Sequence, residues 1–262
     1  MKMLFIGDIV GKAGRETVRR LVPELRREYN IQFVVANGEN SAGGNGITAS
    51  CAAELSEVVN VITLGDHTWD QKGFETAISS CSNVIRPANY AACQPGRGFG
   101  VFNNPAGGDV AVIALQGKVF MRESARCPFE TVDELLKKVP PTAKTIIVDF
   151  HAEATSEKLA MQHYLDGRVT AVIGTHTHVQ TSDGRVSAAG TAMLTDAGMT
   201  GAEESILGRA VPDVIKKFVT GMPGRLNVVE KGLIRLDGAI VTYDYMTGRA
   251  SAIEVISKTV EV

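Results

Sequence analysis

Cysteine is scarce in this chain: its 262 residues include four, at Cys51, Cys81, Cys93 and Cys127. No two of them form a C-x-x-C pair, and nothing in their spacing suggests a disulfide framework. Cys51 lies near the start of one helix-like segment and Cys81 at the end of another. We therefore interpret these thiols as buried or incidental.

Long hydrophobic runs and an excess of basic charge are also missing. No apolar stretch approaches the ~20 residues that a membrane helix needs, and the apolar run before Asp8 is too short for a signal peptide. The formal net charge is −2, which disfavours broad capture of long nucleic acid. A nucleotide or an RNA end held through metal ions is not excluded. We expect a cytoplasmic protein with no membrane partner.

The composition is that of an ordinary globular protein. Hydrophobic residues make up 44% of the chain and charged residues 21%, so a well-buried core can form. We find no internal repeat, low-complexity tract or linker. The sequence therefore predicts a single domain over residues 1–262.

Strand and helix signals alternate in the first half of the chain. The predicted strands are Lys2–Ile9, Ile31–Ala36 and Val61–Leu64, and the predicted helices are Arg15–Tyr29, Thr48–Val59 and Lys72–Ser82. The hydroxyl of Thr48 is placed to cap its helix. This β-α-β-α-β order predicts a parallel sheet with functional loops at the carboxyl ends of its strands.

The second half mixes several kinds of signal. Gly98–Asn103 and Asp109–Leu115 flank a turn-rich stretch, as in an antiparallel hairpin. The other predicted elements are an irregular segment at Gln116–Phe129, helices at Thr131–Lys138 and Ser156–Leu165, strands at Thr145–Phe150 and Thr170–Ile173, and short strands in Gly232–Val260 separated by Asp237-Gly238 and Thr247-Gly248. Mixed strands favour an α/β fold with two packed sheets flanked by helices.

Histidines lie at the ends of the strand-like runs. Four of the five are placed beside turn glycines or acids, at His67, His151, His176 and His178. Runs that end in Asp8 and in Glu39-Asn40 follow the same pattern. Oxygen and imidazole ligands that converge from separate strands suit divalent metals. The pattern therefore predicts a two-metal site for hydrolysis at a phosphorus centre, whereas we expect His163, inside a predicted helix, to lie on the surface.

Several of these residues have a second interpretation or a specific role. Asp8 precedes Gly11 and Gly14 in a turn that loosely resembles a dinucleotide loop, but the glycine spacing differs and an Asp there would repel a pyrophosphate. The carboxylate of Glu39 can bridge two cations. His67 can protonate a leaving alkoxide.

The remaining signals concern a histidine pair and nearby loops. His176 and His178 are separated by one residue, so in an extended strand both would point to one side. His151 as a ligand requires an acceptor for its other ring nitrogen. We interpret Trp69 as loop packing. Lys118, Arg122 and Arg126 can meet a substrate but are interpreted as solvated loop charges.

The same residues carry a resemblance to a known family. Gly7-Asp8, Gly38-Glu39-Asn40, Gly65-Asp66-His67, His151 and Gly174-Thr175-His176-Thr177-His178 resemble, in order, the five motifs of calcineurin-like metallophosphoesterases. The strings Ile6–Gly11, Asp149–Lys158 and Thr195–Gly201 are similar to the bacterial YmdB-like branch of that superfamily. The similarity runs from Asp8 to beyond Gly201.

That resemblance implies a four-layer αββα sandwich of two mixed β-sheets flanked by helices. It also implies a first metal held by Asp8, Glu39, Asn40 and His178, a second held by Glu39, Asp66, His151 and His176, and His67 as the catalytic histidine. The implied cofactors are two divalent or trivalent metal ions, with iron favoured and manganese or zinc as alternatives. The implied activity is hydrolysis of 2′,3′- and 3′,5′-cyclic nucleotides by a metal-activated hydroxide, in a homo-oligomer.

Two positions depart from the superfamily pattern. Val10 stands where the first motif usually has histidine, and Asn40 fills in as ligand. Asp66 stands where the third motif usually has asparagine. An extra negative ligand would hold the second metal harder and weaken its Lewis acidity.

Three other functions remain open at this point. One is a phosphomonoesterase or phosphoprotein phosphatase that uses the same metals. Another is a weakly active regulatory or RNA-associated protein, which the extra charge of Asp66 would favour. The third, a dehydrogenase-like protein, would bind a nicotinamide cofactor at Gly11 and Gly14.

Overall fold

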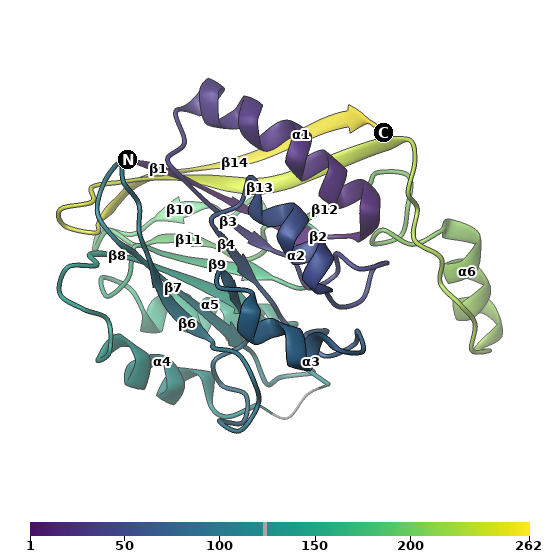
Figure 1. Cartoon of the computed structure of the whole chain (residues 1–262), viewed down its shortest axis with the longest axis horizontal. Coiled ribbons are helices and arrows are strands. Elements are labelled where there is room, and N and C mark those ends of the chain that lie inside the picture. Colours follow the sequence, from purple (N-terminus) through teal and green to yellow (C-terminus); the bar gives the residue numbers. More distant parts are fainter. Residues whose placement is uncertain (123–124) are drawn as a thin grey trace.

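Two β-sheets face each other between outer layers of helices (Figure 1). The computed structural model describes residues 1–122 and 125–262. The first sheet has the order β2 (Asp8–Ile9), β12 (Met199–Ala202), β13 (Leu233–Tyr243), β1 (Lys2–Ile6), β3 (Phe33–Asn37), β4 (Val61–Thr63) and β5 (Val84–Ile85), and β14 (Ala250–Glu261) pairs with β13. The second has the order β10 (Arg185–Val186), β11 (Ala192–Leu194), β9 (Ala171–Thr175), β8 (Thr145–His151), β7 (Val110–Gln116) and β6 (Phe99–Phe102). The predicted four-layer αββα class is confirmed.

Helices cover the outer face of each sheet. On the first sheet lie α1 (Gly11–Tyr29), α2 (Ala49–Ser56), α3 (Phe74–Ala77) and the 3-10 turn η1 (Ile78–Ser80); on the second lie α4 (Pro128–Leu136) and α5 (Thr155–Tyr164). A sixth helix, α6 (Val211–Thr220), stands out to one side of the sandwich (Figure 1). None of the helices in the described ranges is long and apolar enough to span a membrane.

Alternation along the strands builds the layers. In β1, Met3 and Phe5 belong to the core between the sheets, whereas Leu4 and Ile6 pack against the helices above the first sheet. Successive side chains of a strand point to opposite faces, so a strand buried on both faces is apolar throughout. The inter-sheet core includes residues from β1 near one end of the chain and Ala250 of β14 near the other.

Parallel pairing places the functional residues at the carboxyl ends of the strands in each sheet. In the first sheet β1, β3, β4 and β5 are parallel, and in the second β7, β8, β9 and β11 are parallel. Asp8, Glu39 and Asp66 follow β1, β3 and β4, while His151 ends β8 and His176 follows β9. Ligands collect outside the carboxyl ends of such strands.

The first predicted strand is interrupted. Lys2–Ile9 is wrong as one strand, because β1 ends at Ile6 and the chain crosses at Gly7 to a new partner, β12. The Gly7 N–H donates to the Asp237 carbonyl at 3.0 Å. A Cβ at Gly7 would lie 2.1 Å from the Gly198 carbonyl oxygen, so only glycine allows this crossing.

The tail is also more regular than predicted. Asp237-Gly238 does not separate short strands, because β13 runs unbroken through it, while the turn at Thr247-Gly248 is confirmed. A Cβ at Gly238 would lie 2.3 Å from the Phe5 carbonyl oxygen. Glycine therefore marks close approach of β1 here and not a turn.

Other boundaries differ by a few residues. Helix α1 begins at Gly11, four residues before its predicted start. The predicted helix Lys72–Ser82 forms only the short α3 and η1. The hairpin of β6 and β7 and the Thr48 cap are confirmed, the latter by a 3.2 Å hydrogen bond from the Cys51 N–H. The four cysteines form no disulfide, and His163 is exposed on α5.

Candidate metal centre

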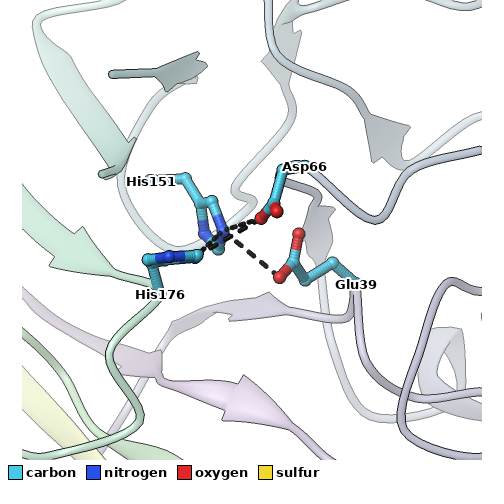
Figure 2. Close-up of side chains that lie close together, drawn as sticks. All are labelled: Glu39, Asp66, His151 and His176. Carbon is cyan, nitrogen blue, oxygen red and sulfur yellow. Dashed lines mark hydrogen bonds and ion pairs between the residues drawn. The ribbon is translucent and has the colours of Figure 1, made fainter. Parts of the chain in front are cut away.

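Four predicted ligands meet where the two sheets present their carboxyl ends. One ligand atom from each of Glu39, Asp66, His151 and His176 lies within 4.8 Å of all the others (Figure 2). His151 Nε2 is 3.2 Å from Glu39 Oε1 and 3.0 Å from Asp66 Oδ1. His176 Nδ1 is 3.3 Å from Asp66 Oδ1. The first sheet thus supplies the carboxylates and the second the imidazoles.

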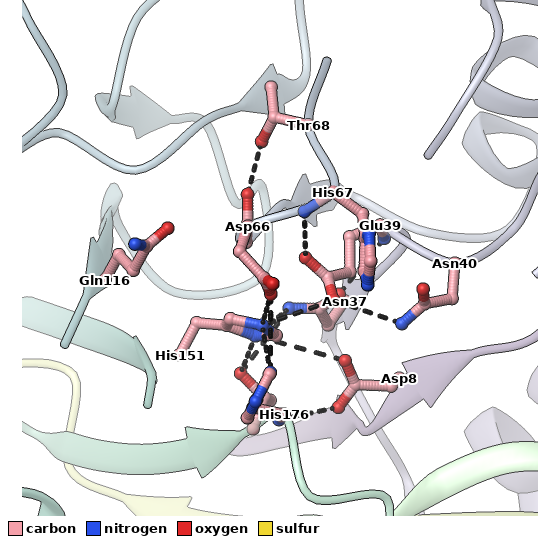
Figure 3. A network of polar contacts seen from close by, with 12 residues as sticks. Asp8, Asn37, Glu39, Asn40, Asp66, His67, Thr68, Gln116, His151 and His176 are labelled. Atoms are coloured by element: carbon pink, nitrogen blue, oxygen red, sulfur yellow. Dashed lines mark hydrogen bonds and ion pairs between the residues drawn. The ribbon is translucent and has the colours of Figure 1, made fainter. Parts of the chain in front are cut away.

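A second group adjoins the first through Glu39. The Asn40 amide nitrogen lies 3.1 Å from Glu39 Oε1 and 3.1 Å from His178 Nε2. Asp8 Oδ1 lies 3.9 Å from His178 Nε2 and 3.9 Å from His151 Nδ1. The structure therefore brings together the predicted ligand residues. In Figure 3, Glu39 lies between Asp66 and Asn40.

His151 is held from behind by a buried polar network. Its Nδ1 lies 2.9 Å from the Thr175 hydroxyl, which donates to Asp149 at 2.7 Å. The Asn37 amide also donates to Asp149, at 3.2 Å. Because Nδ1 is engaged in this way, Nε2 is the nitrogen turned to the carboxylates, as expected for an oriented ligand.

The His176 and His178 pair is not extended as predicted. β9 ends at Thr175, and the two histidines have φ values of 107° and 64°. Such positive φ values are uncommon outside glycine and need support from their surroundings. Part of that support is a hydrogen bond from the His176 N–H to Asp8 Oδ2 at 3.0 Å. Both rings reach the centre from this turn.

Further support for the turn comes from a buried ion pair. The ammonium of Lys158, on α5, lies 2.7 Å from Asp196 Oδ2 and both residues are almost fully buried. The same carboxylate accepts hydrogen bonds from the Thr177 N–H at 3.0 Å and hydroxyl at 2.8 Å. Since Thr177 lies between the two histidines, this pair fixes the turn that carries them.

Burial and charge perturb the site strongly. Burial raises the pKa of Asp8 well above its ordinary value, and the charge of His151 only partly opposes it. Burial would also raise the pKa values of Glu39 and Asp66, but the adjacent histidines, His151 foremost, outweigh it and lower both. Burial lowers the pKa of His178 to about 4. The His178 ring is therefore neutral at pH 7, the form in which imidazole binds metals.

These features fit bound cations. Asp8 Oδ1 is buried and has no hydrogen-bond partner among the described residues. Leaving such an atom unpaired is costly, and a cation would satisfy it. Three carboxylates, those of Asp8, Glu39 and Asp66, are buried here beside the imidazoles of His151 and His176. Oxygen and nitrogen donors without thiolate suit iron, manganese or zinc.

His67 lies beside the ligand groups. Its backbone N–H donates to Glu39 Oε2 at 3.2 Å, and its ring Nδ1 lies 2.7 Å from Asp70 Oδ2. With Nδ1 engaged by that carboxylate, Nε2 is the nitrogen available to a ligand. His67 lines the same cavity as Glu39, His176 and His178.

That cavity has a volume of about 440 Å³ and extends beyond the predicted residues. Its outer wall comes from the segment 206–226, which includes α6 and contributes Leu207, Arg209 and Phe218. Sequence patterns gave no role to this segment. Pro212 in the first turn of α6 and Gly221 after its end were the available helix signals.

The cationic residues of the irregular segment lie elsewhere. Lys118, Arg122 and Arg126 are not among the residues that line the cavity, and Arg126 instead pairs with Glu134 at 3.0 Å. Trp69 packs against the core of the first sheet, and its indole N–H donates to Gln94 at 2.9 Å. The interpretation of Trp69 as loop packing is confirmed.

The dinucleotide alternative finds no room at the start of α1. The Glu230 carboxylate accepts hydrogen bonds from the N–H groups of Lys12 at 3.2 Å and Ala13 at 2.7 Å. A pyrophosphate would need these helix N-terminal groups. Glu230 therefore already occupies the place where a dinucleotide would bind.

Comparison with known proteins identifies relatives that match nearly the whole chain. The chain is 44% identical over 255 residues to a Bacillus subtilis (strain 168) protein named 2′,3′-cyclic-nucleotide 2′-phosphodiesterase, covering 97% of this chain and 96% of that one. A solved structure from Thermus thermophilus, described as a hypothetical protein, superimposes with a TM-score of 0.91 at 37% identity and covers 99% of both chains.

A second solved structure, from Mycoplasma pneumoniae and described as a novel phosphatase, has a TM-score of 0.92 at 33% identity. It covers 100% of this chain and 94% of that one. The model of the family described as YmdB-like protein matches residues 4–256. This match spans nearly the whole chain and includes every residue of the centre. The chain belongs to the YmdB-like family, as its motifs predicted.

Proposed function

We propose that this protein is a metal-dependent phosphodiesterase that hydrolyses cyclic nucleotides, with 2′,3′-cyclic monophosphates as its main substrates and 3′,5′-cyclic monophosphates as further ones. The observation that carries the proposal is the pair of ligand groups that share Glu39. The Bacillus subtilis relative, named for hydrolysis of 2′,3′-cyclic nucleotides, supports the substrate class.

Each residue of the centre has a proposed role. Asp8, Asn40 and His178 would hold one cation, Asp66, His151 and His176 would hold the other, and Glu39 would be available to both. Two such cations, when bound, would supply a nucleophile from water at neutral pH and would offset the charge of the phosphate oxygens. Iron is the favoured metal on family grounds, with manganese and zinc as alternatives.

His67 is the proposed general acid. The departing sugar oxygen takes up negative charge as its bond to phosphorus breaks, and a proton from His67 Nε2 neutralises it. Asp70, 2.7 Å from Nδ1, orients the ring. The reaction then needs no covalent intermediate on the protein.

The test is a panel of substrates offered to protein of known metal content. We expect turnover of 2′,3′-cyclic AMP, weaker turnover of 3′,5′-cyclic AMP, and loss of both after chelation. Robust hydrolysis of a phosphopeptide alone would indicate a phosphoprotein phosphatase instead. Binding of RNA by metal-loaded protein without hydrolysis of any diester would indicate a regulatory protein.

A further inference from the structure

The cavity above the metal centre has two chemically different parts. Its floor is polar and is formed by the centre itself, with His67 and His176 among its side chains. Its outer wall is apolar and includes Leu207, Phe218 and Leu226. The volume of about 440 Å³ lies within the range of small-molecule sites, roughly 300–1,000 Å³. Such a cavity suits a ligand with an anionic end and an apolar end.

The outer wall exposes its apolar surface although it is firmly attached. Phe218 is 79% exposed and Leu207 is 45% exposed, while Val214 on the same helix is buried and anchors it. Arg209 ties the segment to the rest of the site by donating to the Gly44 carbonyl at 2.6 Å, and it joins the two ends of the segment by donating to the Leu226 carbonyl at 3.0 Å. Exposed apolar surface beside a polar site indicates contact with a ligand.

We propose that this wall binds the base of the nucleotide, with the aromatic ring of Phe218 stacked on the base while the phosphodiester lies over the metal centre. The inference rests on the proposed function and names the part of the substrate that the segment 206–226 recognises. Every nucleobase has a π face that an aromatic ring can stack on. The positive charge of Arg209, which also lines the cavity, favours an anionic ligand there.

This wall predicts tolerance among bases. The leucine and phenylalanine side chains of the wall offer no hydrogen bond to the edge of a base, so the stacking contact does not distinguish one base from another. The four nucleoside 2′,3′-cyclic monophosphates should therefore be hydrolysed with similar kcat/KM. A cyclic diester without a base, such as glycerol 1,2-cyclic phosphate, should be a much poorer substrate.

The experiment compares Phe218→Ala with a matched control, Val219→Ala. Val219 is 80% exposed on the same helix but does not line the cavity. We expect Phe218→Ala to lower kcat/KM for the cyclic nucleotides about tenfold or more, the loss of one stacking contact. The value for glycerol 1,2-cyclic phosphate should not change, and Val219→Ala should resemble the parent protein with both substrates.

A binding measurement separates this inference from the proposed function. Calorimetry with a nucleoside 3′-monophosphate measures binding to the wall without turnover. Phe218→Ala should weaken that binding, whereas glycerol phosphate should bind the parent protein and Phe218→Ala alike. Equal losses with the base-free ligand, or the same loss in Val219→Ala, would overturn the inference. Sedimentation of both variants shows whether such losses arise because these side chains lie at an interface between copies of the chain. If Phe218→Ala weakens binding of the nucleotide but not of glycerol phosphate, and the parent protein hydrolyses no diester, only the proposed function is overturned.

Discussion

His67 differs from the other histidines of the centre in its partner. Its Nδ1 faces Asp70, which is 38% exposed and lies outside the ligand groups, whereas His151 and His176 face the buried carboxylates of Glu39 and Asp66. A histidine held by one outer carboxylate can exchange a proton without disturbing bound cations. This separation allows its role to be tested apart from metal binding.

Replacement of His67 by glutamine should slow turnover and leave the metal in place. We expect kcat for 2′,3′-cyclic AMP to fall by roughly 10²- to 10⁴-fold, the usual contribution of a general acid. A p-nitrophenyl diester should lose much less, because its leaving group needs no proton. Steady-state kinetics and metal analysis measure both effects. His163→Gln, at an exposed position on α5, is the control; equal losses for both esters would contradict the assignment.

Asp66 adds a negative charge where the superfamily usually has a neutral asparagine. Its carboxylate lies 3.0 Å from His151 Nε2, and its pKa is lowered because its contacts with His151 and His176 together outweigh burial. An ionised ligand holds a cation more tightly than an amide does. We therefore expect Asp66→Asn to lose metal more readily during dialysis against a chelator.

Metal content after graded chelation measures that difference. Glu75→Gln, which removes an exposed carboxylate on α3, should retain metal as the parent protein does. A kinetic assay of fully metal-loaded Asp66→Asn should show a higher kcat than the parent protein has, because a less neutralised cation is the stronger Lewis acid. Equal metal retention by the parent and Asp66→Asn would refute the proposed role of the extra charge.

At the scale of elements, local patterns located the strand ends but not their partners. Asp66 and His151 were each assigned from the strand that precedes or contains them, yet their 3.0 Å contact joins two sheets that pairing and packing bring together. Glycine was the main source of error, since Gly7 and Gly238 serve close backbone approach that only the folded sheet reveals. The sequence did not predict the outer wall of segment 206–226, because its exposed apolar residues contribute little to any core.

The ion pair of Lys158 and Asp196 connects α5 to the turn that carries His176 and His178. Replacing Lys158 by methionine leaves a buried, unpaired Asp196 carboxylate, which costs about 3–5 kcal/mol. The Thr177 contacts should loosen with it, so we expect lower metal retention even at temperatures where the variant is folded. Circular dichroism and metal analysis on the same sample separate the two effects.

A surface ion pair provides the matched control for that substitution. Lys258 lies 3.1 Å from Glu28 and its side chain is 38% exposed. Lys258→Met should change the free energy of unfolding little and leave metal retention unchanged. Full metal retention in folded Lys158→Met would show that the buried pair stabilises the fold without positioning the histidine turn.

At the scale of the whole molecule, the centre lies between two sheets that share one core. That core combines Met3 of β1 and Val112 of β7 with Ala250 of β14, so segments from both halves of the chain contribute to it. We therefore propose that residues 1–262 form a single domain that unfolds in one cooperative transition. Two separated transitions in calorimetry would contradict this proposal.

Metal removal should lower the stability of the entire domain. The proposed ligands extend from Asp8 to His178, and only folding gathers them, so cations bind the folded chain and stabilise it. At a free metal concentration about 100 times Kd the gain is roughly 2.7 kcal/mol, equivalent to a rise in Tm of about 5–10 °C. Asp8→Asn should show a smaller rise, because it removes the charge of a proposed ligand whose Oδ1 has no hydrogen-bond partner among the described residues. Differential scanning calorimetry with and without chelator measures both proteins, and a metal-independent Tm in the parent would show that the carboxylates between these sheets do not hold cations.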